Sequence, residues 1–382
     1  MRILLSLPGG IAQVDRGVQI PVFIQLLNSL SRRVELTVLV PDTHLQETSV
    51  ALDQAIDIIP IPMAEAAVPT GREIHLIRSI VRTIRARRPA LVHAFWALPM
   101  GFAAVVAGRV TRVPSVVSFF GAETASIPEI RYGNVIRPST RWATAFVVRF
   151  ADHLHLLTKF QERQLRFFFP SKDAVSVIPL GIDRIWARFE PKRRRHSPFR
   201  VLHVASNVPV KDQETLLRAF AFVHKSIDAL LNVVGPRLSS DPLLTLAGEL
   251  GIASFVRFTG FVPHTAIWDL YDWADVFVLS SLYESQGIVV SEAALRGVQV
   301  VGTRTGIIAD WEGTRALAVS PGQPEALAQA ILRCHAGWST LEGLRRTAHQ
   351  WVLQHDVEWT ADQMLHMYEN TLATRRHPRK RP

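Results

Sequence analysis

The stretch from Val276 to Ala294, VFVLSSLYESQGIVVSEAA, contains the pattern that decides the fold. Its apolar run Val276–Leu279 predicts a buried strand, and the residues from about Gly287 onward predict a helix. The polar loop between them is short, so the stretch is typical of the strand–loop–helix half of a parallel βαβ unit. Ligands are expected at loops of this kind, because open parallel sheets bind them beyond the carboxyl ends of their strands.

Two glutamates flank the expected start of this helix. Glu284 lies in the loop, and Glu292 lies inside the helix, roughly 7 Å along its axis at about 1.5 Å per residue. The free N–H groups of a helix N-terminus bind phosphate, and glycine at position 287 lets an anion approach the backbone closely. A nucleoside diphosphate is therefore expected here, with ribose hydroxyls at Glu292 and an attached group at Glu284. The alternative is an ordinary βα unit in which both glutamates are loop or surface charges.

Outward from this stretch, short apolar runs alternate with helical patterns along both halves of the chain. The expected strands are Ile3–Leu7, Glu35–Val40, Leu91–His93, Ser115–Phe119, Leu154–Leu157 and Ala174–Ile178, then Phe199–Ala205, Leu230–Val234, Phe255–Phe258, Val276–Leu279, Val298–Gly302 and Ala316–Val319. This alternation predicts an α/β protein with two parallel-sheet domains.

The chain has 382 residues, which fits two domains of about 150 residues each. The alternation is interrupted by the polar, proline-containing segment 189–198. The predicted parts are a first Rossmann-like domain at 1–188, a basic linker at 189–198, a second Rossmann-like domain at 199–355, a helix at 356–374 that packs back on the first domain, and a disordered basic tail at 375–382.

The formal net charge is +10, from 43 Lys and Arg against 33 Asp and Glu. Nine positive charges lie in two runs, Lys192–Arg195 and Arg375–Arg381, so the rest of the chain is nearly neutral. These runs indicate an anionic membrane surface as a partner, while a solubilising tail and non-specific nucleic-acid binding stay open as alternatives. Specific nucleic-acid recognition is disfavoured, because no aromatic residues are interleaved in either run.

A third basic segment combines charge with an apolar stripe. Isoleucines and a valine at helical spacing (Ile74, Ile77, Ile80, Val81 and Ile84) are surrounded by Arg72, Arg78, Arg82, Arg85, Arg87 and Arg88. One interpretation is a basic amphipathic helix that lies on an anionic membrane. The other is a surface helix whose stripe packs on the sheet.

The cellular compartment is predicted from cysteine content and hydropathy. The single cysteine, Cys334, excludes a disulfide framework and fits a reducing compartment. The apolar run Ile3–Leu7 is too short for a signal peptide, and no run approaches the roughly 18–20 residues of a membrane span. A cytoplasmic protein is expected, with peripheral binding at the cytoplasmic face of a membrane as an extension.

Several ordered segments resemble glycosyltransferase family 4. The Glu-x7-Glu pair in SLYESQGIVVSEAALRGVQVVGTRTG is similar to the signature of that family, and so are VIPLGIDRIWARFEP and VLHVASNVPVKDQETLLRAF. Further similar segments are LNVVGP, VRFTGFVPHTAIWDLYDWADVFVLSS, RGVQIPVFIQLL and VHAFWALPMG. The resemblance implies the GT-B fold, in which two Rossmann-like domains face each other across a deep cleft, and a retaining transferase that uses a nucleotide sugar.

The same resemblance implies roles on the donor side. Glu284 would contact the donor sugar, Glu292 the ribose, and Lys211 the diphosphate. Backbone N–H groups of Gly287, Ile288 and Val289 would bind the phosphate, with Gly17 in the loop that closes over it and Ser206 beside Lys211.

Roles in the first domain follow by the same resemblance. His93 would be a catalytic residue at the cleft, and Gly121 and Glu123 would lie on the acceptor side. Three positions depart from the family pattern. Ser206 stands in a place usually occupied by arginine, Phe120 replaces a histidine, and the segment 306–310 matches its motif loosely.

The expected chemistry needs no metal. No Asp-x-Asp motif occurs, and Cys334-His335 has no partner at zinc-like spacing, so no cofactor beyond the donor substrate is expected. Lys211 and the helix N-terminus would stabilise the leaving diphosphate. Two functions are carried forward: a glycosyltransferase acting on a glycan, lipid-linked or glycolipid acceptor, and a non-catalytic nucleotide-sugar-binding or scaffold protein.

Overall fold

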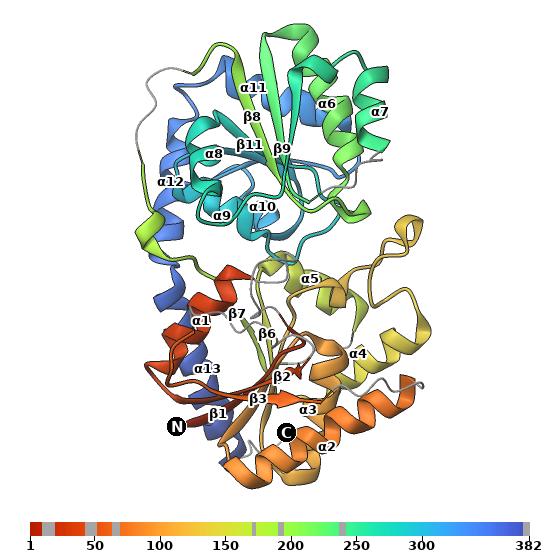
Figure 1. The fold of residues 1–382 in the computed structure, drawn as a ribbon, viewed down its shortest axis with the longest axis vertical. Helices are drawn as coiled ribbons and strands as arrows, with labels where there is room; N and C mark the ends of the chain where they lie inside the picture. Colours follow the sequence, from red (N-terminus) through yellow and green to blue (C-terminus); the bar gives the residue numbers. More distant parts are fainter. Residues whose placement is uncertain are drawn as a thin grey trace. The chain divides into compact units, whose positions relative to one another are not determined.

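A computed structural model describes residues 1–9, 20–42, 52–62, 69–169, 173–189, 195–236 and 242–376. The chain forms two compact units: Met1–Gly181 together with Val357–Pro382 (unit 1), and Ile182–Asp356 (unit 2). Figure 1 shows that each unit is a sheet with helices packed on it. The expected α/β fold with two parallel sheets is confirmed.

The described part of unit 1 contains a seven-stranded parallel sheet in the order β3-β2-β1-β4-β5-β6-β7. The strands are β1 (Arg2–Ser6), β2 (Glu35–Pro41), β3 (Asp57–Ile61), β4 (Leu91–Phe95), β5 (Ser115–Ser118), β6 (His153–Leu156) and β7 (Val175–Val177). Its α-helices are α1 (Pro21–Ser31), α2 (Pro69–Arg87), α3 (Phe102–Thr111), α4 (Pro138–Phe150), α5 (Lys159–Phe168) and α13 (Val357–Arg376). Helices α2, α3 and α4 lie on one face of the sheet and α1 lies on the other, where it packs beside α13.

The strands are apolar because both faces of the sheet are covered. All five residues of β4 are buried, as is typical of a central strand in a parallel sheet. The stripe of α2 is part of this core: Ile80 and Ile84 are buried, and Ile77 and Val81 pack against them. Of the two interpretations of this helix, packing of the stripe on the sheet is therefore confirmed.

Unit 2, over the same described ranges, has a six-stranded parallel sheet in the order β10-β9-β8-β11-β12-β13. The strands are β8 (Phe199–Val204), β9 (Ala229–Val234), β10 (Val256–Gly260), β11 (Val276–Leu279), β12 (Gln299–Thr303) and β13 (Leu317–Val319). Its α-helices are α6 (Gln213–Ser226), α7 (Pro242–Glu249), α8 (Ile267–Trp273), α9 (Ile288–Leu295), α10 (Gly306–Trp311), α11 (Pro324–Ala336) and α12 (Glu342–Gln354). The strand order reverses between β8 and β11, and ligands of open α/β sheets bind at such a reversal.

The edge strand β3 was not predicted from the sequence. Its sequence DIIPI carries an aspartate and a proline, which weakens the strand signal. Pro60 is tolerated because β3 pairs on one side only, with β2, so the missing N–H costs no ladder hydrogen bond on the open side.

The units divide at different residues from those expected. Residues 182–188, expected in the first domain, lie in unit 2, where Trp186 stacks on Trp268 with ring centroids 5.1 Å apart. The Trp186 carbonyl also accepts a hydrogen bond of 3.0 Å from Arg296. The stacked tryptophans therefore fix this segment to unit 2.

The two basic runs are only partly described. Helix α13 continues through Arg376, and Arg375 lies 3.8 Å from a carboxylate oxygen of Asp152, so the helix takes the first two residues of the segment expected as a tail. Residues 190–194 and 377–382 lie outside the described residues. Among the helices that are described, none combines the length and the apolarity required to cross a bilayer.

Polar contacts attach α13 to α1. Glu358 accepts a hydrogen bond of 2.9 Å from Ser29 and pairs with Arg32 and Arg33, while Asp362 pairs with Arg33 at 2.7 Å. Partial burial alone would raise the pKa of Glu358, but the hydrogen bonds from Arg33 and Ser29 outweigh it, so its pKa lies below the ordinary value. The charged carboxylate therefore stabilises the helix pair.

We expect Glu358→Gln to lower the Tm at neutral pH by about 2 °C, a small effect because the pair is partly exposed. A carboxyl whose pKa is lowered on folding stabilises above that pKa and loses the contribution as pH falls through it. The difference between wild type and variant should therefore shrink in thermal melts as the pH falls below the ordinary glutamate pKa of about 4.3, and vanish below the lowered pKa of Glu358. Glu35→Gln, at a more exposed pair with Arg2, serves as control; an equal shift there would contradict the assignment.

Candidate active site

Two loops meet where the strand order of unit 2 reverses. One follows β8 and carries Lys211 at the end of a 3₁₀ turn (Pro209–Lys211); the other follows β11 and carries Glu284. The Lys211 Nζ atom lies 2.5 Å from Glu284 Oε1, which also accepts a hydrogen bond of 2.6 Å from the Ser281 hydroxyl. Glu284 is only 9% exposed, and the ammonium of Lys211 balances the negative charge of this buried carboxylate.

Hydrogen bonds between the two loops hold them in register. The Ser280 hydroxyl donates to the Lys211 carbonyl at 2.8 Å, and the Leu282 N–H donates to the Val210 carbonyl at 2.8 Å. The hydroxyl of Thr303, at the end of β12, donates to the Ser281 carbonyl at 2.5 Å. The positions of Lys211 and Glu284 are thus set by the backbone of three adjacent strands.

The N-terminus of α9 lies directly after this loop. Gly287 precedes the helix with φ 87°, a left-handed conformation that favours glycine, and no side chain caps the first turn. The first-turn residues Ile288 and Val289 are half-buried. An uncapped helix N-terminus beside a lysine is an arrangement that binds an anion such as a phosphate.

Glu292, one turn further along α9, is 5% exposed and has both oxygens bonded. The Tyr271 hydroxyl donates to Oε2 at 2.7 Å, and His264 Nε2 lies 3.0 Å from Oε1. Burial and the negative charge of Glu292 raise the pKa of Tyr271 well above its ordinary value, so the hydroxyl stays protonated as a donor. The sequence pattern points to neither His264, in the loop between β10 and α8, nor Tyr271, on α8, because their contact with Glu292 arises only from the fold.

Gly306 closes the site from the third loop. Its φ is +52°, and a Cβ atom there would lie 2.5 Å from the Gln286 carbonyl oxygen and 2.8 Å from the Glu284 Cβ. The Ile307 N–H also donates to the Gln286 carbonyl at 2.8 Å. The start of α10 therefore packs directly on the glutamate loop.

The remaining predicted residues are distributed over both units. Ser206 is exposed in the loop after β8, in unit 2. Gly17 lies outside the described residues, and His93, Gly121 and Glu123 belong to unit 1.

His93 is completely buried in unit 1. Its ring nitrogens lie 2.8 Å from the Tyr368 hydroxyl and 2.6 Å from the Ser118 hydroxyl, which in turn lies 2.6 Å from His155. Burial and neighbouring histidines lower the pKa of His93 well below its ordinary value, and burial lowers that of His155 to about 4. The imidazole of His93 is therefore neutral and, in this conformation, contacts protein groups on both sides.

Glu123 is likewise internal. It is 1% exposed, and it accepts hydrogen bonds from the backbone N–H groups of Gly121 at 2.7 Å and Ala97 at 3.2 Å. Burial raises the pKa of its carboxyl, against the lowering effect of these backbone hydrogen bonds. Phe120 stacks on Phe23 with centroids 5.3 Å apart, so an aromatic cluster occupies this position of unit 1.

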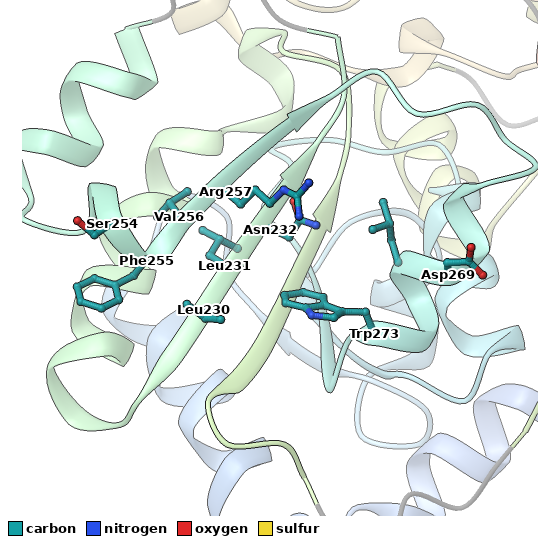
Figure 2. Close-up of a pocket in the computed structure, with 10 residues that line it drawn as sticks. Leu230, Leu231, Asn232, Ser254, Phe255, Val256, Arg257, Asp269 and Trp273 are labelled. Carbon is teal, nitrogen blue, oxygen red and sulfur yellow. The ribbon is translucent and has the colours of Figure 1, made fainter.

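A separate pocket of about 450 Å³ lies elsewhere in unit 2. Its lining comes from the part of β9 between Leu230 and Asn232, from the start of β10 with Arg257, and from Trp273 of α8 (Figure 2). Because the amino ends of these strands form it, it is not the site that contains Lys211 and Glu284. No group of three or more His, Cys, Asp or Glu residues suited to a metal ion occurs within the described ranges.

The chain matches two protein-family models in succession. Residues 21–181 match a glycosyl transferase 4-like domain, and residues 185–351 match glycosyl transferases group 1. Bacillus subtilis TuaC, a glycosyltransferase named for teichuronic acid biosynthesis, is 28% identical over 269 residues, which are 67% of this chain and slightly under two thirds (64%) of that protein. The D-inositol 3-phosphate glycosyltransferase of Acidothermus cellulolyticus is 29% identical over 350 residues, 83% of this chain and 75% of that protein.

Solved structures share the fold. Anabaena HepE in complex with UDP superposes with a TM-score of 0.75 at 19% identity, covering 97% of this chain and 100% of that one. Sucrose-phosphate synthase from Thermosynechococcus elongatus superposes with a TM-score of 0.79 at 19% identity, covering 98% and 99%.

We expect Gly306→Ala to destabilise the protein by about 3 kcal/mol, since it adds a collision with the Gln286 backbone to the cost of positive φ. Gly313→Ala is the matched control, because Gly313 has φ +71° with open space around it. Its cost should be about 1–2 kcal/mol, for φ alone. Urea unfolding of both variants measures the difference; equal costs would show that the α10 contact does not restrain the glutamate loop.

We also expect Tyr271→Phe to cost about 1–3 kcal/mol, because it leaves a buried oxygen of Glu292 without its donor. A double-mutant cycle with Glu292→Leu separates this effect from lost packing. In the Glu292→Leu background the substitution should be nearly neutral. An unchanged cost in that background would mean that the hydroxyl does not act on Glu292.

Proposed function

We propose that this chain, which belongs to the family 4-type glycosyltransferases with the GT-B fold, is a retaining enzyme that moves a sugar from a UDP- or GDP-linked donor to an acceptor hydroxyl. The observation that carries the proposal is the contact between Lys211 and Glu284 beside the uncapped N-terminus of α9. It brings a cation, a carboxylate and backbone N–H groups to the one edge of the sheet where ligands of such folds bind.

The proposed donor lies along α9. Its diphosphate would meet the N–H groups of Ile288 and Val289 and the ammonium of Lys211, which exchanges its contact with Glu284 for the phosphate. The ribose hydroxyls would bind Glu292, whose carboxylate is oriented by Tyr271 and His264. The released Glu284 would then accept hydrogen bonds from the sugar.

The reaction requires stabilisation of the leaving diphosphate, and it does not require a nucleophile from the protein. The bond between the sugar C1 and the diphosphate oxygen breaks, and the pair of electrons leaves with the diphosphate. Lys211 and the helix dipole stabilise that charge; the dipole contributes about 0.3–1 kcal/mol at exposed sites and more when buried. The acceptor oxygen forms the new bond on the same face, and its proton passes to the leaving phosphate, so no protein nucleophile is required.

The relatives support the classes of donor and acceptor. HepE is described in complexes with UDP and with UDP-glucose, which favours a uridine nucleotide as the donor here. The proposed acceptor is a hydroxyl of a glycan, a lipid-linked glycan or a glycolipid precursor, by analogy with TuaC. We place the reaction in the cytoplasm or at the cytoplasmic face of a membrane, in keeping with the single buried cysteine.

A non-catalytic nucleotide-sugar-binding protein is the second candidate. Two observations favour it: the exposed Ser206 offers no charge where the family has arginine, and Phe120 belongs to an aromatic cluster where the family has histidine. It predicts binding of a donor without turnover.

We expect Glu284→Ala to lower kcat at least about 100-fold while the donor still binds, because Lys211 and the α9 N-terminus remain. Lys211→Ala should weaken binding of the diphosphate itself. Donor hydrolysis and transfer with a panel of UDP- and GDP-sugars measure the first effect, and the thermal shift with UDP or GDP measures the second.

Glu325→Ala, at an exposed glutamate in the first turn of α11, is the matched control and should leave both properties unchanged. If no nucleotide sugar raises the Tm of the wild type, the proposed enzyme is wrong. If a donor binds but is never turned over, the non-catalytic function replaces it.

A further inference from the structure

One face of unit 1 has a charge pattern that the proposed reaction does not use. The sequence contains no aspartate or glutamate from residue 74 to 122, and none from 130 to 151. These ranges hold most of α2 and all of α3 and α4, which lie next to one another on the same face of the sheet (Figure 1).

The arginines of this layer are exposed. They are Arg78, Arg82, Arg85, Arg87 and Arg88 at α2, Arg109 and Arg112 at α3, and Arg137, Arg141 and Arg149 at α4. Arg87 pairs with Asp57 at 3.0 Å. Within the described ranges, no carboxylate lies at ion-pair distance from the others, so their charge is available to an anionic partner.

An aromatic strip accompanies these charges. Phe102, Trp142, Phe146 and Phe150 contact one another in sequence, with centroid distances of 6.4 Å or less. The guanidinium groups of Arg109 and Arg149 lie over the Phe150 ring at 5.2 Å and 5.6 Å. The arginines therefore sit directly on apolar rings, as side chains at a boundary between apolar material and water do.

Apolar side chains also point outward from this layer. Trp142 is 65% exposed, Val110 63% and Ile74 50%. Trp142 further lines a mainly apolar groove of about 580 Å³, together with Leu98, Pro99 and Phe102, while Glu73, Ser139 and Thr140 supply its polar part. Exposed tryptophan next to arginine is typical of the membrane interface, where the ring lies at the level of the lipid headgroups.

We propose that the α2–α3–α4 layer docks on an anionic lipid bilayer. The arginines would contact lipid phosphates, and Trp142 would enter the headgroup region with the groove beside it holding acyl carbons. A bilayer fits better than RNA, because the strip offers a few outward apolar side chains on a layer of helices rather than rings spaced to stack bases. Helix α2 takes part mainly through charge, since its apolar stripe is buried in the core except for Ile74.

The experiment is flotation of the full chain with vesicles of phosphatidylglycerol and phosphatidylcholine in about a one-to-two ratio, against pure phosphatidylcholine. Wild type should bind the anionic vesicles only, and added salt should weaken binding. Since each arginine near such a surface contributes about fivefold, Arg78→Gln/Arg82→Gln/Arg85→Gln should weaken binding at least tenfold. Trp142→Ser should weaken it without changing the charge.

Two variants of unit 2 are matched controls: Lys225→Gln/Arg257→Gln/Arg333→Gln removes three exposed charges, and Phe222→Ala removes an exposed ring. Both should bind like wild type. Wild type that ignores anionic vesicles, or a control that loses binding as strongly as the α2 variant, overturns the proposal. The proposal is also overturned if a single-stranded RNA oligomer binds as tightly as the anionic vesicles and Trp142→Ser leaves vesicle binding unchanged.

The proposal does not depend on the enzymatic activity. The thermal shift with UDP, measured on the same variants, tests the donor site separately. Retained vesicle binding in a protein that binds no nucleotide would leave the membrane face established and the proposed function wrong.

Discussion

The architecture of the site depends on the contact between two loops that the sheet of unit 2 brings together. The Lys211 ammonium and the Glu284 carboxylate meet because β8 and β11 are neighbours, although the two residues are far apart in sequence. Backbone and hydroxyl hydrogen bonds from Ser280, Leu282 and Thr303 fix the loops. The positions of Lys211 and Glu284 are therefore set by the pairing of the strands that carry these loops. An ion pair held in this way is preorganised, and a polyanionic ligand has only to replace one carboxylate around the lysine.

The same constraint explains the glycines at the site. Gly287 must adopt a positive φ for α9 to begin immediately after the loop, and Gly306 must lack a Cβ atom for α10 to approach the Gln286 carbonyl. The three strand-end loops therefore pack closely at the backbone level. Neither glycine carries a side chain that could cover the α9 N-terminus, at Gly287 because of its positive φ and at Gly306 because of the close Gln286 backbone.

The sequence was sufficient to predict the β11–loop–α9 unit, because a buried central strand and a following helix have strong and distinct apolar periods. The position of Lys211 in the loop after β8 was predicted as well, because it is a local feature of the sequence, while its role stays a prediction. Tyr271 and His264 escaped prediction, because they reach Glu292 only through the placement of α8, which packs Trp268 against Trp186 from a distant segment. The burial of His93 escaped for a related reason: its partner Tyr368 comes from the last helix, and sequence alone does not distinguish a hydrogen-bonded core histidine from an accessible one.

The position of that last helix has a consequence for biosynthesis. Unit 2 is one continuous segment inserted into unit 1, whose final helix is the last described element to leave the ribosome. Unit 2 is complete once Asp356 has been synthesised, while the first unit still lacks α13 and Tyr368. Because chains are made from the N-terminus, the inserted unit is free to fold first, and the Nδ1 of His93 and the face of α1 lack their partners until α13 has been synthesised. A chain released after unit 2 would therefore contain the complete sheet of unit 2, together with a sheet of unit 1 that lacks the cover of α13.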